Sequence, residues 1–460
     1  MYKLTVDLQN KAHAKRTNLH ILKNLYISAL TFISMLDINL IREKPEVVKK
    51  NQIKAGKSPK DVDELLKLDR EWRSKKKEVD DLRAERNNIS EEINKLKKKK
   101  EDKKAEELIR KAKLIPDRIK VLEEQADILR KRIDEIIFSL PNIISEKTPV
   151  GKDASENIEI KKSGKPKKFS FPVKTHVELA EALGIADFDA SAKVSGNGFY
   201  YLKNELAILN QALIRFSIDF MKSKKYQYIE TPIMIKQDIF AGSEGMQAFA
   251  NSIYKVDGTD LALIGTAEHA LMAMHKNDAF QEAELPKKYF SYSMCFRKEI
   301  GSHGINEKGL WRTHQFNKIE QFIFCLPENS EKYYNELMKN SEEILKKLGL
   351  PYRIIEICTG DLALWKHRSA DFEVWRPTTK EYGEVMSLSN ITDYQARTHN
   401  IKVIRKSGER QVVHTLNNTA LATSRILVAI LENFQNKDGS INIPKALWKY
   451  TGFKKIPAKK

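Results

Sequence analysis

The chain has 460 residues, of which 41% are hydrophobic and 31% charged, so it is long enough for two or three domains with a sizeable core. Its net charge of +19 favours a polyanionic partner such as nucleic acid, although a generally lysine-rich composition would give the same charge. No apolar run reaches the ~18–20 residues that span a bilayer, so we expect no membrane segment.

Residues 1–34 begin with scattered lysines and continue into a short apolar run at 26–33, which is typical of a targeting segment. They contain no clear small-residue cleavage site, and Asp7 is unusual in a transit peptide. We therefore expect either an extension that the protein does not need or a start codon upstream of the true beginning, which we place at Met35. A targeting segment is the alternative.

The segment 61–140 carries apolar residues at alternating spacings of three and four, in two successive seams with charged outer surfaces. Between them lies 95-KLKKKKEDKK-104, which reads as a solvated turn. This pattern predicts an antiparallel coiled-coil hairpin. Pro116 leaves two alternatives open, since it either kinks the second helix or lies in its first turn and leaves 97–115 as a looser tip.

Seven lysines gather at the predicted tip, between positions 95 and 104. A coiled-coil hairpin usually serves as a spacer or a dimerisation element. A lysine cluster at the end of a long rod instead fits contact with a phosphate backbone.

The remainder of the chain alternates helical and strand-like stretches. Residues 146–173 are polar and predict a linker or an edge strand. Helices are expected at 176–184, 203–224, 330–348 and 418–433, and strands at 226–231, 289–294, 317–324, 353–357 and 401–404. This order indicates an α+β fold rather than a βαβ repeat, and neither G-x-x-x-x-G-K-[ST] nor G-x-G-x-x-G is present.

The stretch 295–322 has charges where a strand should be apolar. Alternation at period two puts Arg297 and Glu299 on one face of a strand, and Phe316, Lys318 and Glu320 on one face of the next. Charges on the covered face of a sheet need partners, so we expect a ligand there.

Four motifs occur in the order found in one enzyme family. Tyr226 is followed by Glu230-Thr231-Pro232, then come 265-GTAEH-269, the stretch 295–322 and 415-TLNNTALATSR-425. With the preceding hairpin, residues 35–460 resemble seryl-tRNA synthetase, a class II aminoacyl-tRNA synthetase. The resemblance implies an antiparallel β-sheet flanked by helices, preceded by the coiled-coil hairpin.

The resemblance also implies the reaction. ATP would activate L-serine to seryl-adenylate, and serine would pass to the 3′ end of tRNA(Ser); whether tRNA(Sec) also serves stays open. We expect a tRNA-binding domain at 35–145, whose arm spans 61–140, and a catalytic domain at 146–460. A homodimer and Mg²⁺ are implied too, and isolated cysteines (Cys295, Cys325, Cys358) fit a cytoplasmic protein.

Guanidinium groups suit the phosphates of ATP because they are permanently charged and bond bidentately. Arg297 and Arg425 are the expected catalytic residues, Phe316 offers a flat face to adenine with Arg425 on its other side, and Glu299 can accept from the adenine amino group. The expected ATP-binding residues are Arg297, Lys298, Glu299, Arg312, Thr313, Phe316, Glu384, Val385, Met386, Ser387 and Arg425. Glu384 and Ser387 match the family's Mg²⁺ ligands, and hard oxygen donors are what Mg²⁺ prefers.

The serine site must hold an ammonium, a carboxylate and a hydroxyl group. Its expected residues are Thr266, Ala267, Glu268, Arg297, Lys318, Glu320, Asn417 and Thr419. His314 lies among these motifs and is interpreted as a structural hydrogen-bond donor, not as an acid or base. No general base or nucleophile is expected, because positioning and charge stabilisation are sufficient for this chemistry.

Four departures from the family pattern stand out: Lys225 for a usual Gly, Gly198 for a usual Arg, Met386 for a small residue, and the whole stretch 365–373. Two other functions compete with the enzyme. One is a catalytically inactive paralogue that binds RNA or acts as a scaffold, and the other is a ligase that loads a carrier protein or another RNA. Intact arginine and glutamate motifs weigh against the first, and the basic hairpin against the second.

Overall fold

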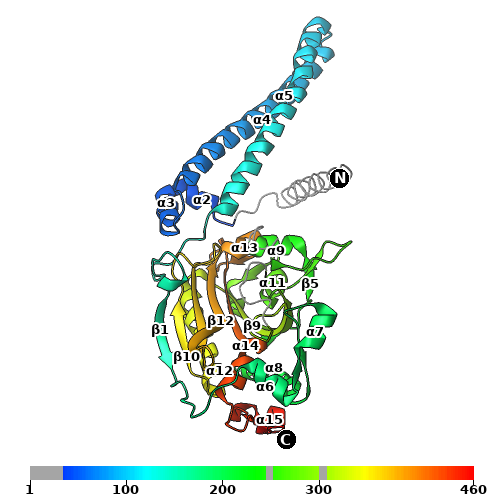
Figure 1. The fold of residues 1–460 in the computed structure, drawn as a ribbon. Coiled ribbons are helices and arrows are strands. Elements are labelled where there is room, and N and C mark those ends of the chain that lie inside the picture. Colours follow the sequence, from blue (N-terminus) through cyan, green and yellow to red (C-terminus); the bar gives the residue numbers. More distant parts are fainter. Residues whose placement is uncertain (1–34, 245–251, 300–307, 460) are drawn as a thin grey trace, which may run out of the picture. The chain divides into compact units, whose positions relative to one another are not determined.

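The computed structural model describes residues 35–244, 252–299 and 308–459 (Figure 1). The chain divides into two compact units, one ending at Pro141 and the other beginning at Asn142. Residues 1–34, for which an extension is expected, lie outside the described residues. Within the described ranges, no helix is both long enough and apolar enough to cross a membrane.

The first unit is helical. Its helices are α2 (Ile38–Glu43), α3 (Pro45–Lys54), α4 (Lys60–Lys98) and α5 (Asp102–Ser139). The 39 residues of α4 give it a length of about 58 Å. Together α4 and α5 form the antiparallel hairpin that the apolar seams predict (Figure 1).

Apolar packing and cross-helix ion pairs hold the hairpin together. Its buried seam consists of Val79, Leu82, Ile89, Ile115, Ile119 and Leu122. On its surface, Arg83 lies 2.6 Å from Glu123 and Arg118 lies 2.7 Å from Glu78. Exposed pairs of this kind add little stability but favour one antiparallel register.

The tip is tighter than the sequence predicts. Only residues 99–101 separate the two helices, so most of 95–104 is helical. Pro116 lies inside α5, which starts at Asp102, and the first-turn alternative with a looser 97–115 tip is therefore wrong. All seven tip lysines are exposed.

The second unit is built on an eight-stranded sheet. Its strand order is β1-β10-β11-β12-β15-β9-β8-β4, antiparallel throughout except for the β4–β8 pair. These strands are β1 (Ile158–Ser163), β4 (Gln227–Tyr228), β8 (Lys287–Phe296), β9 (Gln315–Cys325), β10 (Tyr352–Glu356), β11 (Arg368–Arg376), β12 (Glu381–Thr392) and β15 (His414–Ala422). The α+β class with an antiparallel sheet is thus confirmed.

Smaller sheets and helices surround this sheet (Figure 1). The other described strands are β2 (Ala186–Asp187), β3 (Tyr201–Leu202), β5 (Met234–Lys236), β6 (Leu261–Leu263), β7 (Ala279–Gln281), β13 (Lys402–Ile404), β14 (Arg410–Val412), β16 (Ile441–Asn442) and β17 (Lys455–Ile456). The α-helices are α6 (His176–Leu183), α7 (Phe188–Ser195), α8 (Asn204–Ser223), α9 (Gln237–Glu244), α11 (Ala267–Ala273), α12 (Ser330–Leu348), α13 (Tyr394–Thr398), α14 (Thr423–Asn433) and α15 (Trp448–Thr451). Short 3-10 turns are η1 (Ala154–Glu156), η2 (Glu282–Glu284), η3 (Pro327–Asn329) and η4 (Lys445–Leu447).

Strand β9 shows how the sheet separates core from site. Ile319 and Ile323 point into the main apolar core, which also contains residues of α8, α12 and α14. On the opposite face, Phe322 and Phe324 belong to a second apolar cluster with α11. Further along that same face the side chains become polar, because position 320 and the alternate positions before it line a cavity.

Two sequence expectations need correction, and one open alternative is resolved. Strand β8 ends at Phe296, so Arg297 and Glu299 follow the strand instead of sharing its face, and Glu299 takes a φ of 49°. Residues 418–422 continue β15, and the helix expected at 418–433 starts only at Thr423. Within 146–173, residues 158–163 form the edge strand β1.

Candidate active site

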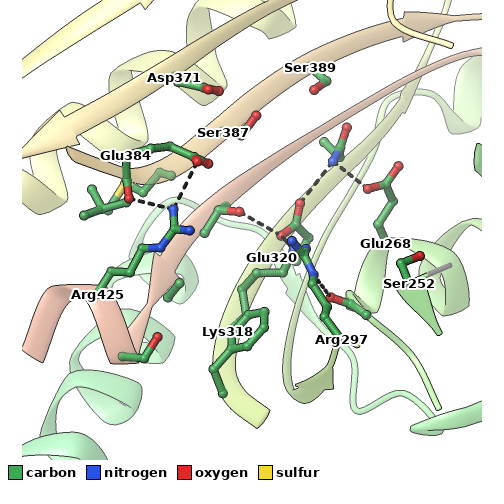
Figure 2. A pocket seen from close by; sticks show the side chains of 18 of the residues that line it. Ser252, Glu268, Arg297, Lys318, Glu320, Asp371, Glu384, Ser387, Ser389 and Arg425 are labelled. Carbon is green, nitrogen blue, oxygen red and sulfur yellow. Dashed lines mark hydrogen bonds and ion pairs between the residues drawn. The ribbon is translucent and has the colours of Figure 1, made fainter. Parts of the chain in front are cut away.

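A cavity of about 510 Å³ lies against β9, β12 and β15 (Figure 2). Most of the residues expected from sequence line it. These are Glu268, Arg297, Glu299, Arg312, Thr313, Phe316, Lys318, Glu320, Glu384, Val385, Met386, Ser387, Asn417, Thr419 and Arg425. They come from separate strands, from helices α11 and α14, and from the segments after β8 and before β9, so only the fold brings them together.

Three expected residues do not line the cavity. Ala267 is packed in the apolar cluster behind it, and Lys298 lies with its ammonium 5.9 Å from the centre of the Tyr254 ring. Thr266 caps α11 and lies one contact behind the cavity wall, where its hydroxyl accepts from Lys318 Nζ at 2.6 Å.

A buried ion pair occupies one end of the cavity. Lys318 Nζ lies 2.7 Å from Glu320 Oε2, and the two side chains are almost fully inaccessible to solvent. Both are on β9, two residues apart, so the alternation of the strand places them on one face. Burying two charges is costly unless they are paired and hydrogen-bonded, and here both conditions hold.

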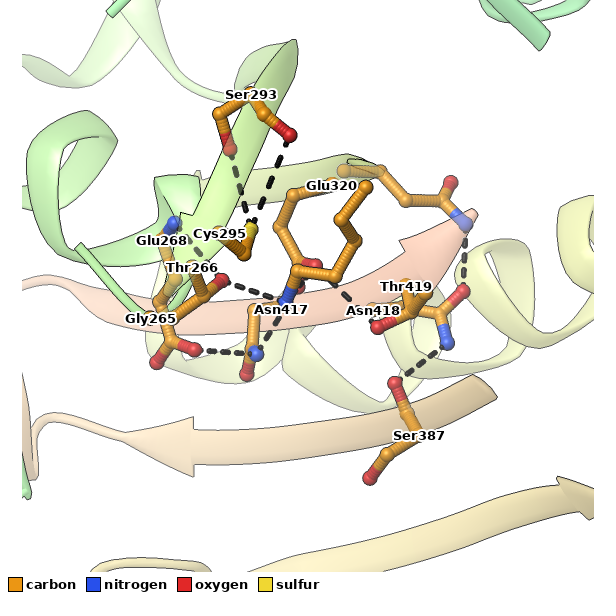
Figure 3. A network of polar contacts seen from close by, with 12 residues as sticks. Gly265, Thr266, Glu268, Ser293, Cys295, Glu320, Ser387, Asn417, Asn418 and Thr419 are labelled. Carbon is orange, nitrogen blue, oxygen red and sulfur yellow. Dashed lines mark hydrogen bonds and ion pairs between the residues drawn. The ribbon is translucent and has the colours of Figure 1, made fainter. Parts of the chain in front are cut away.

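Asn417 extends this pair into a network (Figure 3). Its Nδ2 donates to Glu268 Oε2 at 2.7 Å and to Glu320 Oε1 at 3.2 Å, while Thr419 Oγ1 donates to Glu320 Oε2 at 3.4 Å. Among the described residues, Asn417 Oδ1 is buried and has no hydrogen-bond partner. The network therefore leaves an acceptor available to a ligand with a donor group.

Another part of the cavity is rich in guanidinium groups. Arg425 donates to the backbone oxygen of Glu384 at 2.8 Å and to its Oε2 at 3.0 Å (Figure 2). Its guanidinium lies 5.4 Å from the centre of the Trp311 ring. Arg312 lies 3.7 Å from Glu299. These arginines are partly exposed to the cavity and so remain accessible to an anion.

Hydrogen bonds and an aromatic ring fix the position of Arg297. Its Nε donates to the backbone oxygen of Gly265 at 3.2 Å, and its guanidinium lies 5.4 Å from the centre of the Phe316 ring. The Arg297 N–H donates to the backbone oxygen of His314 at 2.9 Å, and His314 Nδ1 bonds the backbone oxygen of Arg297 at 2.9 Å. His314 does not line the cavity, which fits its interpretation as a structural donor.

Two carboxyl groups at this end have opposite pKa shifts. Burial raises the pKa of Glu384, but the charge and hydrogen bond of Arg425 outweigh it and the net shift is downward. Burial and the charge of Glu384 raise the pKa of Asp371 to about 7, against the opposing charge of Lys366. Asp371 Oδ1 is buried without a hydrogen-bond partner in the described residues.

Several cavity residues escape sequence reasoning. They are Ser252, Ile253, Gly265, His269, Trp311, Trp365, Lys366, Asp371, Ser389, Ala422 and Ser424. Asp371 and Ser389 lie on the neighbouring strands β11 and β12. Periodicity alone does not show which face of the sheet either side chain occupies. For several of them the sequence did carry a signal, because they stand in the motifs themselves: Gly265 and His269 in 265–269, Trp311 in 295–322, and Ala422 and Ser424 in 415–425.

Two family models match the chain. Residues 35–144 match the seryl-tRNA synthetase N-terminal domain, and residues 254–434 match the class II tRNA synthetase core domain (G, H, P, S and T).

Known proteins resemble the chain over most of its length. The serine–tRNA ligase of Pyrococcus horikoshii is 46% identical over 445 residues, covering 92% of this chain and 97% of that protein. That of Dictyoglomus turgidum is 44% identical over 432 residues, covering 93% and 100%. The crystal structure of the P. horikoshii seryl-tRNA synthetase complexed with ATP superposes with a TM-score of 0.87, at 45% identity, covering 92% of this chain and 100% of that one. With the family's ordered motifs gathered around one cavity, the chain belongs to the seryl-tRNA synthetases of class II.

Proposed function

We propose that the chain activates L-serine with ATP to form seryl-adenylate, and then transfers serine to the 3′ end of tRNA(Ser). The observation that carries this proposal is the single cavity in which the buried Lys318–Glu320 pair lies beside accessible arginines. The buried pair is suited to a small zwitterion, and the arginines are suited to a polyphosphate. The P. horikoshii relative was crystallised with ATP, which supports the same substrate here.

The serine end would work through hydrogen-bond matching. Glu320 and Glu268 are suited to the substrate ammonium and hydroxyl groups. Asn417 Oδ1, which has no hydrogen-bond partner among the described residues, adds an acceptor. Lys318 and Thr419 complete the wall around them. A site that leaves buried polar groups unpaired discriminates by about 10⁴–10⁵ against an analogue that lacks the matching group. Alanine should therefore be rejected.

At the ATP end, the carboxylate of serine would attack the α-phosphorus in line while pyrophosphate leaves. Arg297 would hold the α-phosphate, and Arg312 and Arg425 the outer phosphates. These groups stabilise negative charge as it redistributes in the transition state. In the described structure Arg425 lies against Trp311, so contact with adenine opposite Phe316 remains a proposal.

Mg²⁺ is also proposed, on the donor set at this end of the cavity. Glu384 and Ser387 supply hard oxygens, and the buried Asp371 Oδ1 has no hydrogen-bond partner among the described residues. Such an ion would neutralise phosphate charge when bound. Glu384 Oε2 already accepts from Arg425 at 3.0 Å, so an ion held here would share Glu384 with that arginine.

A division of labour between the two parts of the chain is also proposed. Residues 35–145, with the arm at 61–140, would bind tRNA(Ser) through the exposed tip lysines, and residues 146–460 would carry out catalysis.

A homodimer in the cytoplasm is proposed as well. It is supported by an exposed hollow of about 440 Å³ on α8 and α15 that contains Ile208, which is 45% exposed. Light scattering on the purified chain would test the dimer.

The decisive experiment is serine-dependent exchange of pyrophosphate into ATP, followed by charging of tRNA(Ser). We expect both, with tRNA(Sec) tested as a second acceptor in the same assay. Absence of exchange would contradict the enzyme function and support an inactive paralogue. Exchange without charging would support a ligase for a carrier protein or another RNA.

A further inference from the structure

Lys366 lines the cavity and belongs to the stretch 365–373, which departs from the family pattern. It precedes β11 in a turn whose backbone is fixed on both sides. The Lys366 N–H donates to the oxygen of Ala363 at 2.9 Å, and the next residue, His367, donates to the oxygen of Asn390 in β12, also at 2.9 Å. The turn therefore holds the root of the lysine side chain against the strand that carries Ser387.

The ammonium group itself reaches the wall of the ATP end. Lys366 Nζ donates to Ser369 Oγ at 3.1 Å and lies 3.5 Å from Ser387 Oγ. Ser369 is buried, whereas Lys366 is half-buried and lines the cavity. One partner anchors the ammonium from behind, and the remaining N–H groups are available to something in the cavity.

The charges around Lys366 are unevenly paired. Asp371 and Glu384 face it from β11 and β12, and both feel its positive charge. Arg425 is hydrogen-bonded to Glu384, and the more distant Arg297 also acts on that carboxylate. Lys366 is the cation that acts on Asp371, whose Oδ1 has no hydrogen-bond partner in the described part of the chain.

A lysine that only balances Asp371 would be expected to bond that carboxylate and turn away from the cavity. Here the ammonium instead contacts two serine hydroxyls, that of Ser387 on the cavity wall and that of the buried Ser369. Its four-carbon stem can swing an ammonium by several ångströms, and an ammonium binds phosphate as a point charge without a fixed geometry.

We propose that Lys366 is a further phosphate-binding residue, which contacts the outer phosphates of ATP beside the Ser387 position and so lowers the dependence of ATP binding on Mg²⁺. The inference rests on the proposed function, because it takes this cavity as the ATP site. When little Mg²⁺ is present, the phosphates rely on the cations of the protein, so loss of one ammonium matters most under that condition.

The test is calorimetric titration of the full chain with ATP, in the absence of serine, at sub-stoichiometric and at saturating Mg²⁺. Lys366→Met removes the charge and keeps the stem, and it should weaken ATP binding by about tenfold at low Mg²⁺, the typical effect of one hydrogen bond to a charged group. At saturating Mg²⁺ the loss should fall below about threefold, because the metal then carries part of the phosphate charge. Lys366→Arg should bind nearly as tightly as the unmodified chain.

Matched variants make the result specific. Ser369→Ala removes the hydroxyl that accepts from the Lys366 ammonium, and it should weaken ATP binding less than Lys366→Met does, with the same dependence on Mg²⁺. This variant tests the proposal independently if Lys366→Met fails to fold. Lys332→Met, on the exposed surface of α12, should leave both titrations unchanged.

Two outcomes would overturn the proposal for Lys366. Equal affinity of Lys366→Met and the unmodified chain at both Mg²⁺ levels would make the lysine a structural counter-ion. Tighter binding by the variant would mean that the lysine competes with the metal. If the unmodified chain itself binds no ATP, the proposed function fails instead, so the two failures are distinguishable.

Discussion

At the scale of single residues, Glu320 combines full burial, an ion pair and hydrogen bonds from two neighbouring side chains. Lys318 pairs with it at 2.7 Å, and Asn417 and Thr419 donate to its two oxygens. A neutral side chain of the same shape would keep the space but lose the charge that the substrate ammonium requires. Glu320 is thus the residue that should separate serine binding from ATP binding.

We predict that Glu320→Gln raises the KM for serine by about 100-fold, since a hydrogen bond to a charged group is worth about 1.5–3 kcal/mol. The affinity for ATP should change by less than about threefold, because Glu320 lies at the other end of the cavity. Pyrophosphate exchange over a serine titration, with ATP binding measured in parallel, would check this.

Glu336→Gln is the matched control for this prediction, because it breaks an ion pair to Lys288 that is not part of the cavity lining. It should leave both constants unchanged. An equal loss of serine and ATP affinity in Glu320→Gln would indicate general disruption and contradict a serine-specific role.

The sequence predicts which site residues lie together only where those residues are close to one another along the chain. Phe316, Lys318 and Glu320 could be assigned to one face because a strand alternates with period two. Asp371 could not be placed, since it reaches the cavity through the pairing of β11 with β12, and Lys366 lies in the turn before β11. Such pairings join residues that no local pattern relates.

At the scale of elements, the connection between α8 and β4 contains a residue under conformational strain. Lys225 has a φ of 63°, a left-handed conformation that glycine adopts freely and other residues adopt at a cost. The family usually has glycine here, so the departure seen in the sequence has a structural consequence. Gly198, the opposite departure, has a φ of 78° and accepts the backbone N–H of His314 at 2.8 Å.

We predict that Lys225→Gly stabilises the protein by about 1 kcal/mol, because it relieves the left-handed strain of a lysine. The exposed Lys222 offers a matched control, since it lies in the last turn of α8, where glycine should destabilise by about 1 kcal/mol. Thermal unfolding of both variants would check the opposite signs. A lower melting temperature for Lys225→Gly would contradict the strain argument.

Element boundaries also show why part of the fold was mispredicted. Residues 418–433 are rich in alanine, leucine and isoleucine, which favours a single helix when read locally. In the fold, Asn418 and Thr419 pair with Gln321 and Glu320 of β9, so the sheet extends the strand to Ala422. Tertiary pairing thus overrides the local preference. The hairpin of α4 and α5 was predictable because its apolar contacts repeat along each helix.

At the scale of the whole molecule, removal of charge from the arm should affect tRNA binding and leave the activation of serine unchanged. The tip lysines Lys97, Lys98, Lys99 and Lys100 are exposed and distant in sequence from every cavity residue. Replacing these four lysines with glutamine should raise the KM for tRNA(Ser) by at least about tenfold and flatten its dependence on salt, because fewer counterions are released. Pyrophosphate exchange should stay within about twofold of the unmodified chain.

The control for the arm is a set of four exposed lysines on α12: Lys332, Lys339, Lys346 and Lys347. Their replacement by glutamine changes the net charge equally and should affect the KM for tRNA(Ser) much less. If both sets weaken charging alike, net charge rather than the tip would account for tRNA binding. Equal loss of exchange and charging in the tip variant would contradict the proposed division of labour.

The pH dependence of stability is a second property of the whole molecule. Burial lowers the pKa of His399 to about 4 and that of His414 to about 4, from about 6.5 when unfolded. Between these values the unfolded chain binds more protons than the folded chain, so this stability is fully present above pH ~6.5 and is lost as the pH falls toward 4. At pH ~5.5 each histidine should lower the free energy of unfolding by about 1 kcal/mol. His399→Gln can still donate to the oxygen of Gln395, so its melting temperature should fall less between neutral pH and pH ~5.5 than that of the unmodified chain. Identical pH slopes for the two proteins would mean that the pKa of His399 is the same in the folded and unfolded states, contrary to the effect of its burial.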